Sequence, residues 1–451
     1  MHFLESNDMT NITVNTEKHI GRIKAMHGVG QPPIVGVGTD MFHYLREAGI
    51  PFSRLHDVGG WFGGNLFVDI PNIFRDFDAD ENDPASYTFE FTDIIIKALV
   101  ENNCMPYFRL GVTIENFHEI KAFRIYPPED FGKWARICEH IIRHYNEGWA
   151  NGFRYGIKYW EIWNEPDGHC IAAKNEMWKG TEEEYIDLYR ITSKHLRNCF
   201  GDSIMIGGYA ACGFYQVLTE QHVTGEAFGT TKPQTDWDVR INGFMEFFYK
   251  FIRVVTEEGL PLDFFSYHSY GSVEDNKKMQ KFVEEYLKDH GLEDIEIHLN
   301  EWNTNPRREQ KGSLAACSNA LANMIAMQNM RMEVMCYYDA RIGTSVYGGL
   351  FDPMSFKPLP AYYGFKAFGK LFALGTQAEC LCDSETVYAI AATDTRSSAV
   401  LIANVGEDTE ISLNFDGKAY VIDGEHLLDE MDMDTNSFIL TRDSVIYIER
   451  Q

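Results

Sequence analysis

The sequence predicts an α/β protein: a (β/α)₈ TIM barrel with a small accessory antiparallel β domain of the β-sandwich type. Three observations predict this fold class. Short β-rich runs alternate with amphipathic helical stretches through most of the 451 residues, which is typical of parallel βαβ units. The chain exceeds the roughly 250 residues of a plain barrel, which leaves room for one small further domain. After Leu374 only short β-rich segments follow.

Eight segments have the composition expected of barrel strands. Each is short and rich in β-branched, aromatic or other apolar residues. In chain order they cover residues 22–29, 52–56, 106–112, 158–163, 203–208, 264–268, 295–300 and 334–338. Eight parallel strands are the number that closes a TIM barrel.

The segments between these strands show the period of helices. Apolar residues recur at helical spacing over residues 131–145 and 279–287, and Gly291 follows the second stretch. Thr181 and Glu184 have the spacing of a capping box, which predicts that a helix begins there. We interpret the apolar stripes as the helix faces that pack on the barrel.

The change of pattern also predicts the domain organisation. Residues 21–374 form the predicted barrel, and residues 375–451 form the C-terminal β domain. Within residues 1–20, positions 11–15 alternate like a strand, so we expect this end of the chain to join the β domain. Four later segments alternate in the same way and are separated by turn residues: 387–390, 399–403, 410–415 and 444–448.

The charge restricts the classes of partner. Lys and Arg total 40 and Asp and Glu total 67, so the formal net charge is 40 − 67 = −27. A field of this sign repels phosphate backbones and anionic lipid surfaces, so we expect neither nucleic acid nor a membrane as a partner. A neutral substrate fits this charge better than a polyanion, and a homo-oligomer is compatible with it.

The cysteines and the N-terminus predict a reducing compartment. The nine cysteines are scattered without CxxC spacing, so we interpret them as reduced thiols. Cys380 and Cys382 would share one face of a strand, and we expect no metal there. The first residues lack the basic start and apolar core of a signal peptide, so the sequence predicts a cytoplasmic protein unless a leader was removed.

The most informative stretch covers residues 159–167, Tyr-Trp-Glu-Ile-Trp-Asn-Glu-Pro-Asp. An apolar strand runs into Asn164 and Glu165, and Pro166 then ends regular structure. Glu165 is therefore expected just past the C-terminal end of its strand. In a (β/α)₈ barrel that face carries the active site.

A second stretch, residues 295–303, repeats this pattern and ends a strand with Asn300, Glu301 and Trp302. The two glutamates are 301 − 165 = 136 positions apart, or about 45 residues for each of three βα units, each of which needs about 30 or more. The spacing fits strands 4 and 7 of one barrel. Two carboxyl groups at one barrel mouth match the chemistry of glycosidic bond cleavage, in which one protonates the leaving oxygen and the other captures the sugar carbon. Glu161 and Glu296 lie within strands, and we interpret them as structural carboxylates.

These two motifs resemble clan A of the retaining glycoside hydrolases, and most closely glycoside hydrolase family 39, the β-xylosidase and α-L-iduronidase family. The resemblance covers about residues 23–374. It implies a retaining exo-glycosidase, with Glu165 as general acid/base and Glu301 as nucleophile. It also implies that no cofactor and no metal ion take part.

The resemblance implies further roles at the barrel mouth. Asn164 resembles the amide that binds the sugar 2-hydroxyl, and Arg54 resembles the arginine that keeps the nucleophile ionised. Tyr270 resembles the tyrosine that hydrogen-bonds the nucleophile, while His56 and His268 resemble pocket histidines that contact the sugar. From the residues alone, Arg54 could instead pair with Glu161 or Asp57, and the histidines and Tyr270 could be core residues.

The end of the eighth strand departs from the family pattern. Clan A enzymes commonly place a tryptophan beneath the sugar there, whereas this chain has Tyr337, Tyr338, Asp339, Ala340 and Arg341. The Tyr338 ring can still stack on a sugar face. Because Asp339 and Arg341 add charge to the rim, the sugar can be xylosyl or an alternative such as arabinosyl, galactosyl, glucosyl or iduronyl.

Two other function classes are compatible with a barrel of this kind. A non-catalytic glycan-binding barrel has no use for an acid and a nucleophile together. A metal-dependent hydrolase would need several His and Asp at strand ends, and His56, His268 and Asp339 are dispersed in the sequence. For the glycosidase we expect carboxyl groups about 5 to 5.5 Å apart, as in retaining enzymes. We also expect Glu165 to have a raised pKa, and Glu301 to be kept ionised by Arg54 and Tyr270.

Overall fold

The computed structural model describes residues 9–33, 35–36, 39–58, 68–114, 124–219, 235–304, 310–342 and 348–451. Eight strands form a closed barrel in the order β10-β11-β2-β5-β6-β7-β8-β9, and all neighbouring strands are parallel. The predicted (β/α)₈ barrel is confirmed, and each strand overlaps its predicted segment. The barrel strands are β2 (Ala25–Gly30), β5 (Phe52–Leu55), β6 (Met105–Leu110), β7 (Tyr159–Ile162), β8 (Met205–Ala211), β9 (Phe264–Ser269), β10 (Glu296–Trp302) and β11 (Val334–Tyr337).

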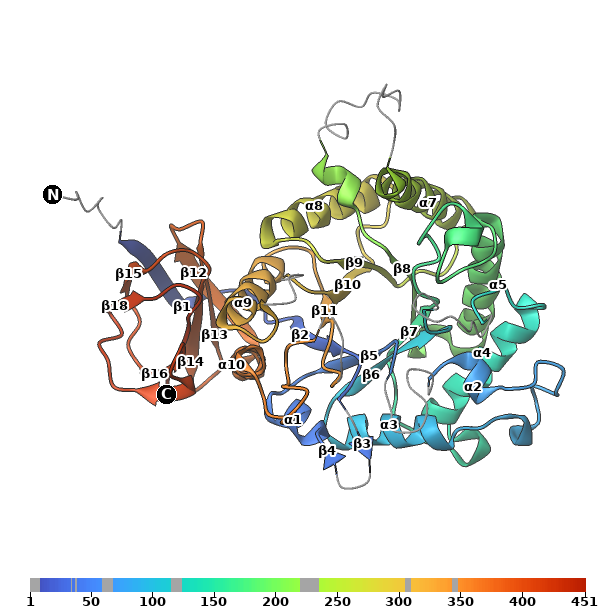
Figure 1. Ribbon diagram of the computed structural model, residues 1–451, viewed down its shortest axis with the longest axis horizontal. Helices are drawn as coiled ribbons and strands as arrows, with labels where there is room; N and C mark the ends of the chain where they lie inside the picture. Colours follow the sequence, from blue (N-terminus) through green and yellow to red (C-terminus); the bar gives the residue numbers. More distant parts are fainter. Residues whose placement is uncertain are drawn as a thin grey trace.

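Helices surround the barrel on its outside (Figure 1). They are α1 (Phe42–Glu47), α2 (Ile70–Ile73), α3 (Glu90–Glu101), α4 (Phe131–Asn146), α5 (Glu182–Phe200), α7 (Asp236–Glu258), α8 (Val273–Asp289), α9 (Leu314–Gln328) and α10 (Pro360–Leu374). The predicted capping box is present, because Thr181 and Glu184 exchange side-chain and backbone hydrogen bonds at the start of α5. Throughout the described ranges, no helix has the length and apolar content that a membrane crossing requires.

The second domain is one curled nine-stranded sheet in the order β17-β16-β19-β14-β13-β12-β1-β15-β18. The N-terminal strand β1 pairs with β12 antiparallel and with β15 parallel, so one pair departs from the antiparallel pattern. The sheet encloses its own core, in which Ile12, Ile402 and Ile446 are buried. Its strands are β1 (Thr10–Arg22), β12 (Thr376–Cys382), β13 (Val387–Thr393), β14 (Ser398–Asn404), β15 (Thr409–Leu413), β16 (Lys418–Ile422), β17 (Leu427–Met431), β18 (Ser437–Leu440) and β19 (Val445–Arg450). A short hairpin, β3 (Val35–Gly36) and β4 (Thr39–Asp40), lies outside both sheets.

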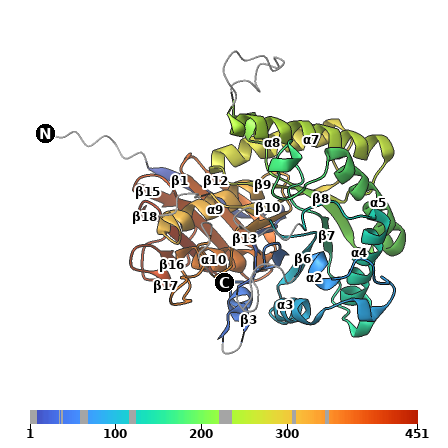
Figure 2. The ribbon, with the colours of Figure 1, turned by 45° about the vertical axis from the view of Figure 1, so that its right-hand side comes forward.

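The β domain packs against one side of the barrel. Helices α9 and α10 lie between the barrel and the sheet, where they contact β13 and β14 (Figures 1 and 2). Ile390, Leu401 and Tyr447 belong to the same buried cluster as the barrel core, and Lys370 of α10 forms an ion pair of 3.0 Å with Glu449 of β19. The β domain and helices α9 and α10 therefore share an apolar interface on the outside of the barrel.

The inside of the barrel changes character along its axis. Near the N-terminal ends of the strands, Tyr107, Tyr159, Phe264 and His298 pack as a layer of rings. The next layer is polar and holds Arg54, Glu161, Ser266 and Asn300, all buried. Residues beyond this layer therefore rest on a base of buried, hydrogen-bonded polar side chains.

Candidate active site

Arg54 is at the centre of the polar layer. It is 1% exposed and donates from Nε to Glu161 Oε2 at 2.8 Å. From the same side chain, Nη1 donates to Glu301 Oε2 at 3.2 Å and Nη2 donates to Asn164 Oδ1 at 2.5 Å. Burial lowers the pKa of the guanidinium, but the charges of Glu161 and Glu301 outweigh burial and raise it. Arg54 is thus a fixed cation that ties β5, β7 and β10 together.

A β-bulge orients Glu301. Along β10, His298 and Asn300 point into the barrel, so strict alternation would turn residue 301 outward. The pairing of β10 with β9 shifts register between Leu299 and Glu301, so Asn300 is an extra residue in β10. Such a bulge changes the direction in which the following side chain points. Glu301 then also points inward, where Tyr270 donates to its Oε1 at 2.5 Å.

A left-handed backbone orients Asn164 and Glu165. Trp163 has φ 71° and packs its ring against Trp134 and Trp178 on the outside of the barrel. The alternation of β7 ends there, which lets Asn164 reach Arg54 on the inside. Glu165 has φ 46° and its amide donates to the Ala210 carbonyl at 3.0 Å, so the chain beyond β7 is fixed to the end of β8.

Glu165 forms an ion pair with a histidine. His268 Nδ1 lies 2.6 Å from Glu165 Oε1 and 3.8 Å from Glu301 Oε2. Burial raises the pKa of Glu165, but the hydrogen bond and the charge of His268 outweigh it, so the pKa is lowered. The raised pKa expected for Glu165 is therefore wrong for this structure, because the hydrogen bond and charge of His268 favour the ionised carboxylate. The pKa of His268 is raised: burial lowers it, and the charges of Glu301 and Glu165 more than compensate.

The end of β5 brings His56 and Asp57 to the same mouth. His56 is 3% exposed, and burial together with the charges of Arg109 and Arg54 puts its pKa well below the usual value, so the ring is neutral. Asp57 accepts a hydrogen bond of 2.9 Å from the Tyr338 hydroxyl, which also accepts one from the Gln31 amide. Tyr338 is 6% exposed and its ring stands perpendicular to that of Tyr270, with 6.4 Å between centroids.

The end of β11 places a further acid at the mouth. Asp339 is fully buried, and its Oδ2 lies 3.7 Å from Arg341 Nη2. Burial raises the pKa of Asp339 to about 7, and the charges of Asp57 and Glu301 also raise it, while Arg341 lowers it. Asp339 and Arg341, which the sequence predicted as charged groups at the rim, are thus a buried acid and its basic neighbour.

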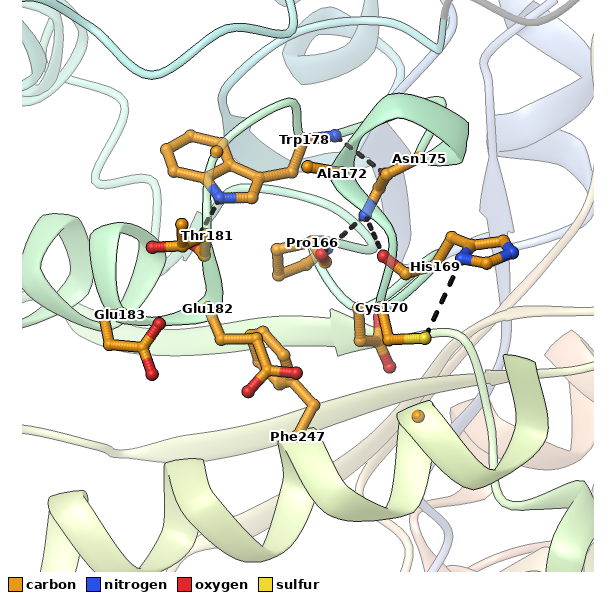
Figure 3. Close-up of a pocket in the computed structure, with 13 residues that line it drawn as sticks. Pro166, His169, Cys170, Ala172, Asn175, Trp178, Thr181, Glu182, Glu183 and Phe247 are labelled. Atoms are coloured by element: carbon orange, nitrogen blue, oxygen red, sulfur yellow. Dashed lines mark hydrogen bonds between the residues drawn. The ribbon is translucent and has the colours of Figure 1, made fainter. Parts of the chain in front are cut away.

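A separate pocket lies beside the segment that follows Glu165, and it encloses about 610 Å³ of empty space, open solvent included (Figure 3). Its wall contains Pro166 and Asp167 but neither Glu165 nor Glu301. In this wall Asn175 donates to the Pro166 carbonyl at 2.8 Å and accepts from the Trp178 amide at 2.9 Å. These bonds fix the segment that carries Glu165, while Glu165 and Glu301 themselves lie at the barrel mouth.

Two groups of side chains in the described ranges have the spacing of metal ligands. Glu165, His268 and Glu301 each offer one ligand atom within 4.8 Å of the others. The Arg54 guanidinium already bonds Glu301 in that group, and a buried cation disfavours a second cation. The other group, Glu139, His195 and Cys199, lies between α4 and α5, away from the mouth.

Comparison with known proteins identifies the family. The model of glycosyl hydrolases family 39 matches residues 46–306, more than half of the chain. The chain belongs to glycosyl hydrolases family 39. Both glutamates at the barrel mouth fall within the matched residues, as does Arg54.

Two curated relatives of this family 39 chain are named beta-xylosidase. That of Geobacillus stearothermophilus is 24% identical over 254 residues, which cover 54% of this chain and 42% of the relative. That of Caldicellulosiruptor saccharolyticus is 27% identical over 287 residues, which cover 59% of this chain and 47% of the relative. The chain therefore aligns with less than half the length of these relatives.

Solved structures match nearly the whole family 39 chain in fold. A glucosidase from Croceicoccus marinus has a TM-score of 0.76 at 19% identity, with 98% of both chains covered. A GH39 beta-xylosidase from Caulobacter crescentus has a TM-score of 0.66 at 16% identity, with 97% of this chain and 99% of that chain covered. The barrel and its β domain therefore form an arrangement that these structures share.

The structure brings all the proposed site residues to one end of the barrel. These are Arg54, His56, Asn164, Glu165, His268, Tyr270, Glu301 and Tyr338. Sequence reasoning missed Gln31, which joins Tyr338, and it named Asp57 only as a pairing alternative for Arg54. Both follow the last residue of a barrel strand within two positions, and that location was the available signal.

Proposed function

We propose that this protein is a retaining exo-glycosidase that releases a terminal sugar, first of all a β-xylosyl residue, from a glycoside or oligosaccharide. Membership of family 39 supports the reaction class, and the names of the curated relatives support xylose as the first sugar to test. The observation that carries the proposal is the carboxylate pair. One oxygen of Glu165 and one of Glu301 lie within 4.8 Å of each other. The carboxyl groups of retaining enzymes are about 5 to 5.5 Å apart and those of inverting enzymes roughly 6.5 to 9.5 Å, so the observed distance favours retention.

In the first step, Glu301 attacks the anomeric carbon while the glycosidic bond breaks. The bond between carbon and leaving oxygen gives its electron pair to that oxygen, which takes a proton from the Glu165–His268 pair. Arg54 and Tyr270 bind one carboxylate oxygen each of Glu301, so both fix its orientation for attack. Asn164 is held by Arg54 beside them, where its amide can reach the sugar.

In the second step, water attacks the anomeric carbon of the glycosyl ester. Glu165 accepts the proton of this water, and the bond to Glu301 breaks, which returns the carboxylate. Two displacements at one carbon leave its configuration unchanged. His268 can share the proton in each step, because its Nδ1 lies 2.6 Å from Glu165.

The decisive experiment compares Glu165→Ala with Glu301→Ala on an aryl glycoside with a good leaving group. Glu301→Ala should be inactive, since no covalent intermediate forms. Glu165→Ala should form the intermediate and then stall, and added azide should restore turnover and give the glycosyl azide with retained configuration. Rescue of Glu301→Ala to the retained azide, or wild-type product of inverted configuration, would refute the assignment.

A panel of aryl glycosides tests the sugar itself. We expect the highest kcat/KM on the β-xyloside, with arabinosyl, galactosyl, glucosyl and iduronyl glycosides as the alternatives. A chelator should leave the activity unchanged. Loss of activity in chelator, restored by a divalent ion, would favour a metal-dependent reaction at Glu165, His268 and Glu301 instead.

A further inference from the structure

Asp57 has a backbone conformation that aspartate adopts only occasionally. It has φ 53°, in the left-handed region, and is 5% exposed. Non-glycine residues are uncommon there, and such conformations concentrate at functional sites when the surrounding structure enforces them. Aspartate tolerates this region better than most non-glycine residues do, so the contacts of its carboxylate decide what the side chain can do.

Only one of the two Asp57 oxygens is satisfied. Oδ2 accepts the 2.9 Å hydrogen bond from the Tyr338 hydroxyl. Oδ1 is buried and makes no hydrogen bond with any residue that the structure describes, and His56 Nε2 lies 3.4 Å from it. The neutral His56 ring cannot supply the charge that a buried carboxylate oxygen needs.

The carboxylate is also close enough to the nucleophile to be influenced by it. The pKa of Asp57 is raised to about 6, because burial and then the charge of Glu301 raise it more than Tyr338, Arg341 and Arg109 lower it. Tyr338 links the two acids through a chain of contacts. It donates a hydrogen bond to Asp57, and its ring packs edge-on against Tyr270, which donates to Glu301. Asp57 therefore belongs to the wall beside the reacting carbon.

We propose that Asp57 is a specificity-determining residue whose Oδ1 accepts a hydrogen bond from a hydroxyl group of the sugar held next to Glu301. This inference rests on the proposed glycosidase function. It specifies the substrate further: the sugar is neutral and carries a hydroxyl at this point, because a uronic acid would place a second carboxylate against Asp57.

The test is a cycle of enzyme and substrate changes. Wild type and Asp57→Gly are assayed on the best aryl glycoside and on its three analogues that each lack one ring hydroxyl. Glycine suits the left-handed backbone, so the variant removes the carboxylate without backbone strain. We expect kcat/KM of Asp57→Gly to fall about 10- to 100-fold on the parent glycoside, the size of a lost hydrogen bond to a charged group.

One analogue should then distinguish itself. Wild type should lose a similar factor on the analogue that lacks the contacted hydroxyl, whereas Asp57→Gly should lose less than about threefold on it, because the partner is already absent. Equal losses at every position in both enzymes would overturn the inference while leaving the glycosidase intact. If the wild type is inactive on all glycosides of the panel, the proposed function is refuted, and this inference with it.

Two further variants exclude simpler explanations. Tyr338→Phe removes the hydrogen bond to Oδ2 but keeps the carboxylate, so it should preserve the selective loss on the distinguishing analogue. If Asp57 only positions Tyr338, the two variants will instead have the same pattern across the analogues. Asp443→Gly is the matched control, because Asp443 has φ 61° in the β domain, and its kinetics should equal those of wild type.

Discussion

The ends of β7 and β10 carry the same dipeptide, Asn-Glu, but the structure surrounds the two glutamates differently. At β10, Glu301 accepts hydrogen bonds from a buried arginine, whose pKa is raised, and from a tyrosine hydroxyl. At β7, Glu165 bonds His268, whose proton is exchangeable in that range. Similar sequence motifs thus have different neighbours, which fit the proposed roles: Glu301 is held by an arginine and a tyrosine, and Glu165 shares a hydrogen bond with a histidine.

Removing the carboxylate of Glu301 should have the largest effect. Glu301→Gln keeps the shape and the hydrogen bonds of the side chain but removes its nucleophilicity, so we expect kcat to fall at least about 10⁴-fold on every glycoside. Glu165→Gln should lose less on a glycoside with a good leaving group, since protonation matters little there. Steady-state rates on one activated and one poor leaving group measure both. Equal losses for the two variants on both substrates would contradict the division of roles.

Arg54 is the next test of the difference, because it bonds Glu301 directly, while its other two partners are Glu161 and Asn164. Arg54→Lys keeps the charge but loses the fork that joins three partners, and we expect kcat to fall about 10²- to 10³-fold. The free energy of unfolding of the variant should also fall by about 3 kcal/mol, because Glu161 and Asn164 lose buried hydrogen bonds. Denaturant unfolding measures this loss. Wild-type kcat in a folded Arg54→Lys protein would show that Glu301 needs no such support.

His268 should set the pH dependence of the acid/base side. The pair holds one proton on a histidine whose pKa is raised, so the alkaline limb of kcat/KM is expected above the ordinary histidine value. In His268→Asn the proton must reside on Glu165 itself, a carboxyl group of lower intrinsic pKa, and the alkaline limb should move to lower pH. We expect kcat at the optimum to fall about 10- to 100-fold. If the alkaline limb of kcat/KM lies at the same pH in the variant as in wild type, His268 does not share the proton with Glu165.

Tyr270 should have a smaller effect on the nucleophile side. Tyr270→Phe deletes one hydrogen bond of Glu301 and leaves Arg54 in place, so about a 10-fold loss in kcat is expected. The pH limb assigned to His268 should remain where it is in wild type, and a full pH profile of the variant checks this. A shift of that limb would show that the two glutamates are not distinguished as proposed.

Much of the barrel follows from the sequence because periodicity and strand ends are local signals. All eight barrel strands overlap their predictions, and Glu165 and Glu301 meet as their positions after strands suggest. The inward turn of Glu301 depends on a bulge, and that of Asn164 on a left-handed Trp163, and neither feature has a local signature here. The lowered pKa of Glu165 depends on His268, 103 residues away, so it needed the tertiary structure. In the β domain, β12, β16, β17 and β18 were not predicted, because short and half-exposed strands alternate weakly.

The smallest effect on activity is expected at Glu296, which lies on the same strand as Glu301 but at the other end of the barrel. Its carboxylate accepts from Tyr159 at 2.7 Å and lies 2.9 Å from His298 and 3.2 Å from Lys158. Burial raises the pKa of Glu296, but these partners outweigh it and lower the pKa to about 2.

A carboxyl group with a depressed folded-state pKa stabilises the fold above its unfolded value of 4.5, and this contribution is lost as the pH falls toward about 2. Glu296→Gln should therefore keep wild-type kcat and KM, while its free energy of unfolding at pH 7 falls by roughly 1 kcal/mol, a size typical of partly exposed pairs. The difference between variant and wild type should shrink from pH 4.5 downward, as urea denaturation at several pH values would show. If Glu296→Gln instead lowers kcat as much as Tyr270→Phe does, a carboxylate at the far end of β10 influences the reaction. The difference between Glu301 and Glu165 would then not depend only on their neighbours at the strand ends.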